Sequence, residues 1–220
     1  MPKNAGPRVR DPERRERILD AAAELIARHG YPSVSLSDIG SAAGIVGSGI
    51  YRHFDNKGAI LVEMFDRVVD HLVSSAEQSL AISPNPEDTL GILVNDQVEL
   101  VLRRRALCQV YVREARNLPE SDQLRLRWRQ RHYVALWEDA LCSLRPTIGT
   151  ELSRVLVRSA IGSIHSILSF TSTLNEPEVA IALRDSACRV LGVTPHPIDF
   201  VSEGNKEDMP QTDGLAQSRR

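Results

Sequence analysis

Cysteine and long apolar runs are scarce in this sequence. The three cysteines among 220 residues, Cys108, Cys142 and Cys188, lie far apart and form no CxxC pair. This pattern excludes a disulfide framework and a zinc site of the usual spacing. No apolar run approaches the ~18 residues of a membrane-spanning helix, and the basic N-terminal stretch lacks the apolar segment of a signal peptide. We therefore expect a protein of the reducing cytoplasm with no membrane partner.

Clusters of catalytic or metal-binding residue types are missing as well. An enzyme needs a nucleophile beside a base, or several metal ligands at close spacing. The six histidines are scattered and form neither an HxxxH nor an HExxH motif. We therefore expect no enzymatic activity, no metal and no cofactor.

Strand signals are also missing, because no segment alternates strictly and hairpin turn dipeptides are absent. Apolar residues recur at helical spacing instead, as Ile18, Ala22 and Leu25 do in the first segment. We predict an all-α fold of about nine helices, punctuated by glycine and proline. They cover about residues 13–29, 36–43, 47–54, 87–103, 105–117, 119–143, 151–173 and 177–191, and a long fourth helix lies between a cap at Asp55 or Asn56 and the break at 83–86.

The stretch from Ser35 to Lys57 is the most informative part of the chain. Ser35 and Asp38 fit a capping box at the start of a short helix, and Gly44 stops that helix before a second short one begins. Ala42 and Ala43 are small enough to let the two helices cross closely. This arrangement fits the helix-turn-helix plan, in which the second helix enters the major groove. The pattern fits equally well an ordinary helical hairpin inside an all-helical protein.

A resemblance adds weight to the DNA-binding interpretation. The order Ile39, Ala43-Gly44, Tyr51-x-His53-Phe54-x-x-Lys57 is similar to the signature of TetR-family repressors, and Gly30-Tyr31 after the first helix also fits. The similarity covers roughly residues 13–61. It implies an N-terminal three-helix helix-turn-helix domain and a C-terminal helical domain that binds a small ligand and dimerises.

The resemblance implies a role for each matching residue. Ser35, Tyr51, His53 and Lys57 would contact operator phosphates, with Lys57 at the favourable N-terminus of the fourth helix. Phe54 would be core. The remaining DNA-binding candidates are Ser37, where many members carry a basic residue, Ser48 and Gly49, which face base edges, and Arg52, which reaches a base or a phosphate. Val46 and Gly47 depart from the family, which usually has a capping Ser or Thr followed by Lys, Arg or Pro.

The charge distribution agrees with a DNA-binding front end. Residues 1–57 hold nine Lys/Arg and seven Asp/Glu, a mildly basic balance that is compatible with phosphate binding. Lys3, Arg8 and Arg10 lie ahead of the first helix, where they form either a DNA-contacting arm or a solvated tail. We assign residues 1–57 to this arm and the DNA-binding domain, 58–193 to the ligand-binding and dimerisation domain, and 194–220 to a disordered tail.

The second domain offers candidates for a ligand pocket between amphipathic helices. Tyr111 and Trp128 are amphipathic aromatics suited to pocket walls, although each fits a core position too. Glu114, with Arg113 and Arg116, has two interpretations: an internal salt bridge, which we favour, or recognition of the polar end of a mainly apolar ligand. A lipid-like molecule or an acyl thioester is one hypothesis for that ligand.

The eighth and ninth predicted helices are the expected homodimer surface, as in the family. The eighth is apolar over much of its circumference, so it needs more than one partner face. His165 on this helix fits a core position, a contact with its symmetry mate or a pocket. A twofold dimer would place two recognition helices on an inverted-repeat operator in double-stranded DNA. We therefore predict a ligand-responsive transcriptional repressor; the alternative is a helical ligand-binding or interaction module with weak or lost DNA binding.

Overall fold

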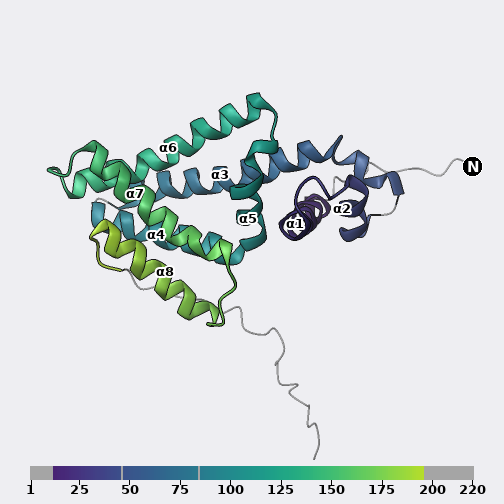
Figure 1. Cartoon of the computed structure of the whole chain (residues 1–220). Helices are drawn as coiled ribbons and strands as arrows, with labels where there is room; N and C mark the ends of the chain where they lie inside the picture. Colours follow the sequence, from purple (N-terminus) through teal and green to yellow (C-terminus); the bar gives the residue numbers. More distant parts are fainter. Residues whose placement is uncertain (1–11, 46, 84, 196–220) are drawn as a thin grey trace, which may run out of the picture.

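The computed structural model describes residues 12–45, 47–83 and 85–195 (Figure 1). Within these ranges every regular element is helical and no strand occurs. Lys3, Arg8 and Arg10, Val46 and the predicted tail from residue 196 lie outside the described residues. The elements are α1 (Pro12–His29), α2 (Leu36–Ala42), the 3-10 helix η1 (Gly47–Arg52), α3 (Lys57–Ile82), α4 (Pro86–Arg103), α5 (Arg105–Glu114), the 3-10 helix η2 (Ala115–Asn117), α6 (Glu120–Leu144), α7 (Thr150–His165), the 3-10 helix η3 (Ser166–Ser169) and α8 (Glu176–Leu191).

The predicted third helix over 47–54 was wrong in type and in its end. The segment is a 3-10 helix that stops at Arg52. Glycines at positions 47 and 49 each disfavour a regular helix by about 1 kcal/mol relative to alanine. The backbone at Gly49 also lies tightly against Ile45, because a Cβ added there would stand 2.8 Å from Ile45 Cγ2.

The predicted eighth helix over 151–173 was too long. The α-helix ends at His165 and continues only as the short η3. The hydroxyls of Ser163, Ser166 and Ser169 each donate to the carbonyl three residues earlier, at 2.7–2.8 Å. Such local bonds compete with regular helical hydrogen bonding and explain why the helix tightens and stops. The predicted helix over 105–117 likewise divides into α5 and η2.

Two apolar clusters organise the fold. The first contains Ile18, Ile39, Ile50 and Phe54 from the N-terminal helices and joins them to α3, α5 and α6. The second fills the larger body between α3, α4, α6, α7 and α8 around the fully buried Trp137. In Figure 1 the N-terminal region lies to the right of the body, and α3 and α5 connect the two. Across the described residues, no helix combines the length and the apolar character that a membrane crossing requires.

Candidate DNA-binding surface and ligand cavity

The helix α2 is fixed at both ends by its own sequence. At its start the Ser35 hydroxyl accepts from the Asp38 N–H at 3.1 Å, and the Asp38 carboxylate accepts from the Ser35 N–H at 2.9 Å, so the predicted capping box is present. At its end Gly44 has a φ of +70°, its N–H bonds to Ser41 O at 3.1 Å, and the Ile45 N–H bonds to Gly40 O at 2.8 Å. This pair of bonds is the Schellman arrangement, which sets the turn toward η1.

Small residues and one aromatic ring hold η1 against the N-terminal helices. A Cβ at Gly40 would lie 3.3 Å from Ile50 Cβ, so α2 and η1 approach as closely as glycine allows. Phe54 is buried in the same cluster. The Arg15 guanidinium lies 4.2 Å from the centroid of its ring and donates to the His53 carbonyl at 2.9 Å. The turn that follows η1 is therefore anchored to α1.

Several predicted DNA-binding residues lie on the surface of this unit. Tyr51 is 58% exposed, Ser37 and Arg52 are exposed, and His53 is half-buried. Gly49 is half-buried against Ile45, and the structure does not describe the side chain of Ser48. The exposed phenol and guanidinium of Tyr51 and Arg52 are thus carried by a short, well-anchored element.

Two other predicted DNA-binding residues bond within the protein. The Lys57 ammonium donates to the carbonyls of Tyr31 and Val34, the latter at 2.6 Å, and lies 4.2 Å from the centroid of the Tyr31 ring. Because an ammonium has three hydrogens, one is left for a phosphate. The Ser35 hydroxyl donates to Asp38 Oδ2 at 2.6 Å as well as accepting from the Asp38 N–H. These hydrogen bonds from Ser35 hold the pKa of the Asp38 carboxyl below its usual value of 3.8.

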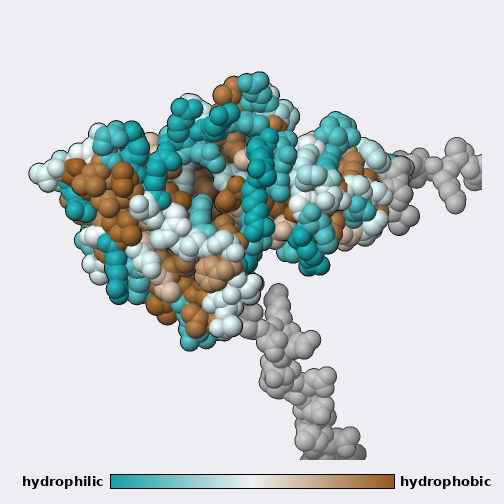
Figure 2. All heavy atoms as spheres, in the orientation of Figure 1, coloured by the Kyte–Doolittle hydropathy of each residue, from teal (hydrophilic) through white to brown (hydrophobic). Residues whose placement is uncertain are grey.

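A cavity of about 410 Å³ opens in the body among α3, α4, α5, α6 and α7. Figure 2 shows a hollow on the face where α5, α6 and α7 meet, with apolar patches inside and hydrophilic residues around it. Its apolar walls come from Val68, Leu72, Leu100, Val134 and Ile161. A mainly apolar interior with a few polar groups is typical of small-molecule sites.

A linked set of polar side chains lies in the wall of this cavity. The Tyr133 hydroxyl donates to Gln97 Oε1 at 2.8 Å, and Gln97 Nε2 lies 3.0 Å from His165 Nε2. Burial lowers the pKa of His165, which favours its neutral form. Tyr111 also lines the cavity, its oxygen accepts from Gln130 Nε2, and burial raises its pKa to about 12. These groups are neutral near pH 7.

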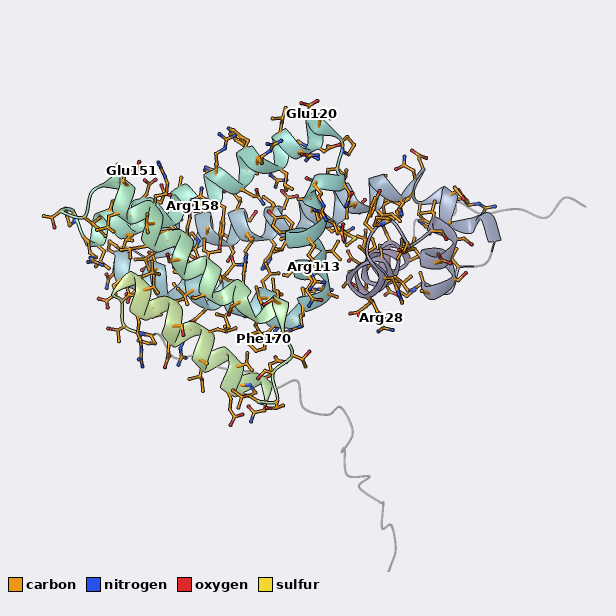
Figure 3. All side chains as sticks on the ribbon, viewed as in Figure 1. Arg28, Arg113, Glu120, Glu151, Arg158 and Phe170 are labelled. Atoms are coloured by element: carbon orange, nitrogen blue, oxygen red, sulfur yellow. The ribbon has the colours of Figure 1, made fainter. Side chains whose placement is uncertain are left out.

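Three arginines complete the lining: Arg127 and Arg131 on α6 and Arg158 on α7. All three are exposed, and Figure 3 shows Arg158 on the part of α7 that runs beside α6. Within the described part of the chain none of them forms an ion pair with a carboxylate. The cavity therefore has an apolar interior and uncompensated positive charge at its edge.

A second hollow of about 450 Å³ lies between α1, α3 and α4, and its three arginines are paired with carboxylates of the same lining. Arg104 contacts Asp20 at 3.0 Å and Arg103 contacts Glu99 at 2.9 Å. Because these partners already neutralise each other, we regard the cavity lined by Tyr111 as the stronger ligand candidate. No group of three or more metal-binding side chains occurs among the described residues.

The structure separates the three residues predicted to bind a ligand. Tyr111 is in the cavity wall, whereas Glu114 and Trp128 are not. Trp128 is 65% exposed on the outer side of α6. The favoured salt bridge of Glu114 was wrong in kind: its carboxylate accepts hydrogen bonds from the Asn117 amide at 2.6 Å and from the Tyr31 N–H at 3.5 Å. Sequence reasoning missed Arg127, Arg131 and Arg158, which helical periodicity cannot distinguish from solvated positions.

The helix α5 contacts both functional regions. Tyr111 lines the cavity and packs edge-on against Phe65 of the N-terminal cluster, with ring centroids 5.2 Å apart. One turn later the Glu114 carboxylate lies 3.5 Å from the Tyr31 nitrogen at the connection between α1 and α2. A shift of α5 would therefore displace residues that contact the helix-turn-helix.

Sequence comparisons identify the family. The family described as "Bacterial regulatory proteins, tetR family" matches residues 18–64, and the "Tetracyclin repressor-like, C-terminal domain" matches residues 83–168. Together the two matches cover more than half of the chain. The chain belongs to the TetR family of transcriptional regulators. The all-helical fold and the helix-turn-helix predicted from the sequence are thereby confirmed.

Individual relatives are similar in sequence or in fold. The transcriptional repressor KstR2 of Rhodococcus jostii is 29% identical over 50% of this chain, which spans 54% of that relative. A TetR-family regulator from Bordetella parapertussis is 27% identical with a TM-score of 0.74, covering 81% of this chain and 94% of that one. The structure of AibR in complex with isovaleryl coenzyme A and operator DNA has a TM-score of 0.67 at 22% identity, with coverage of 83% and 98%.

Proposed function

We propose that this TetR-family protein is a ligand-responsive repressor that binds an inverted-repeat operator as a homodimer. The observation that carries the proposal is the pairing of two sites through shared helices. A capped and anchored helix-turn-helix exposes Tyr51 and Arg52, and a cavity of about 410 Å³ lies in the body. The helices α3 and α5 contribute to both regions.

The operator contacts divide between exposed and bonded side chains. Tyr51, Arg52, His53 and Ser37 approach phosphates or base edges, and Lys57 adds a charge through its remaining hydrogen. Phosphate contacts of this kind make affinity fall steeply as salt rises. Arg52 is the candidate for base readout, because arginine bonds two acceptors of guanine at once.

The dimer would form through the surface of α7 and α8. Large apolar side chains are exposed there, namely Leu152, Val155, Phe170, Leu174 and Ile181. Figure 3 shows Phe170 at the end of η3, beside the start of α8. Exposed apolar side chains on α7, on α8 and in the connection between them support a contact with a second copy of the chain.

The effector proposed for the cavity is an acyl thioester, a lipid-like molecule with an anionic end. An acyl chain suits the apolar walls, and the unpaired guanidiniums of Arg127, Arg131 and Arg158 suit the phosphates of coenzyme A. The likeness to AibR, whose structure holds isovaleryl coenzyme A, supports the same class. Ligand binding releases DNA only to the extent that it favours a body conformation that separates the two helix-turn-helix units.

Fluorescence anisotropy with operator DNA tests the proposal. Duplexes selected from a random pool should contain an inverted repeat, and the purified protein should bind them with an affinity that falls as salt rises. Acyl-CoAs should then release the DNA. Tyr51→Phe removes only the hydroxyl and should weaken binding on all duplexes alike, whereas Arg52→Ala should cost about 1–3 kcal/mol and relax specificity at one base.

Two results would count against the proposal. A dimer that ignores every duplex at low ionic strength leaves only a helical ligand-binding module. If no acyl-CoA alters operator binding or the melting temperature, the proposed effector class is wrong, whereas the proposed DNA-binding function stands.

A further inference from the structure

In the polar wall of the cavity, Gln97 Oε1 and His165 Nε2 already accept hydrogen bonds, whereas two N–H groups have no protein acceptor among the described residues. Gln97 Oε1 receives the Tyr133 hydroxyl hydrogen at 2.8 Å. This bond fixes the amide so that Gln97 Nε2, 3.0 Å from His165 Nε2, faces that ring nitrogen. Since His165 is neutral, its Nε2 accepts and its hydrogen lies on Nδ1.

Two N–H groups remain without a protein acceptor among the described residues. One is the Nδ1–H of His165, and the other is the second hydrogen of Gln97 Nε2. Both residues line the cavity. Because both residues line a mainly apolar cavity, these two hydrogens favour a ligand atom that accepts hydrogen bonds.

The other groups that line the cavity limit further which chemical class of ligand can bind there. Apolar side chains of Val68, Leu72 and Ile161 share the cavity with them, and the arginines supply the positive edge. A ligand that matches the apolar walls, the two N–H donors and the arginines has an apolar chain, an uncharged acceptor oxygen and an anionic end. An acyl thioester has this combination in its acyl chain, its carbonyl and its phosphates.

We propose that His165 and Gln97 are the specificity-determining pair of the cavity, donating hydrogen bonds to the thioester carbonyl of the effector. Tyr133 is a positioning residue that orients Gln97. This inference rests on the effector class of the proposed function, and it adds that the protein discriminates by the carbonyl oxygen and not by chain length and charge alone.

The test compares matched pairs of coenzyme A derivatives. Acyl-CoA thioesters from butyryl to palmitoyl are each paired with the S-alkyl-CoA thioether of the same chain length, which lacks only the carbonyl oxygen. Isothermal titration calorimetry with the full-length protein gives both dissociation constants. At the chain length that binds best, the thioester should bind at least about tenfold more tightly, because its carbonyl oxygen accepts the hydrogen bonds from His165 and Gln97.

Variants of the pair locate the preference. His165→Leu removes the donor, and the ratio of the two dissociation constants should fall toward one. His165→Asn keeps a nitrogen near the position of Nδ1 and should retain part of the ratio. Tyr133→Phe frees the Gln97 amide to rotate and should lower the ratio while the affinity for the thioether stays close to its original value.

The control is His132→Asn, because His132 pairs with Glu77 at 3.0 Å outside the cavity; its ratio should equal that of the unmodified protein. Equal binding of thioester and thioether by the unmodified protein overturns the inference and leaves the effector class intact. Failure of every coenzyme A derivative to bind overturns the inference and the effector class together. The first comparison uses the unmodified protein. It therefore tests the inference even if the His165→Leu protein fails to fold.

Discussion

The N-terminal region and the body of this protein use their polar side chains in opposite ways. In the N-terminal region Ser35, Asp38 and Lys57 bond to backbone groups of their own domain. In the body, Tyr133, Gln97 and His165 bond to one another in a cavity wall. The first pattern fixes a surface before its partner arrives, which suits a partner of constant shape such as duplex DNA. The second leaves hydrogen-bonding capacity for a small molecule that comes and goes.

The same contrast extends to apolar packing. The N-terminal region relies on a few large side chains, with Phe54 between α1 and η1. The body has a larger cluster around Trp137, yet it tolerates a cavity of about 410 Å³ within it. We therefore expect local stability to be more sensitive to single substitutions in the N-terminal region.

The largest expected effect is that of Phe54→Ala. Loss of the buried ring should cost about 3–5 kcal/mol, enough for the N-terminal region to unfold before the body. Both tryptophans, Trp128 and Trp137, lie on α6 in the body. Thermal unfolding followed by tryptophan fluorescence should therefore occur at higher temperature than the first loss of helical circular dichroism.

The matched control is Tyr51→Ala, which removes an aromatic ring that is 58% exposed in the same region. It should leave the two transitions at the same temperature. Coincident transitions in Phe54→Ala would mean that the two regions unfold as one unit and that the contrast in their stability does not exist.

A smaller effect is expected for Gly44→Ala. The position has a φ of +70° and nothing within 4 Å of an added Cβ, so the cost is confined to the backbone, about 1–2 kcal/mol. Gly44→Asn should recover much of this loss, because asparagine adopts left-handed conformations more readily. Operator affinity and chemical denaturation of the two variants measure the difference; equal losses in both would place the cause in something other than the turn.

The smallest effect concerns acid stability, which should differ between the regions. The folded-state pKa of Asp38 is lowered by its bonds to Ser35, so its contribution is present above pH 3.8 and is lost as pH falls through the folded pKa. The pKa of His165 is lowered by burial, so stability begins to fall below pH 6.5. Asp38→Asn should flatten only the most acidic part of the stability profile, and His165→Asn only the part below pH 6.5. Denaturant titrations at a series of pH values check both, and interchange of the two ranges would contradict the assignment.

Much of the fold could be predicted because its boundaries are local in sequence. Gly30 and Gly44 end helices with positive φ angles, and Ser35 caps α2 as its spacing with Asp38 indicates. Both features depend on residues a few positions apart. The type of the third helix was harder to predict, because Ile50 of η1 packs closely against Gly40 of α2 and this contact forms only when the two elements meet.

The cavity was the least predictable part for the same reason. Gln97, Tyr133 and His165 come from three helices and are brought together only by packing. The periodicity of each helix indicates an apolar face but does not indicate where neighbouring faces fail to meet. Tyr111 could be proposed from its amphipathic ring, whereas Trp128, chosen on the same ground, lies on the outer side of α6.

The brevity of α5 has a consequence for how regulation can change. Its ten residues place the cavity tyrosine and the glutamate that contacts Tyr31 on successive turns. In such a short helix, a displacement of the cavity end also moves the end that contacts Tyr31. Replacements at positions of α5 that do not line the cavity, such as Glu114, can therefore abolish or increase the response to the effector without changing a side chain of the operator surface or of the cavity wall.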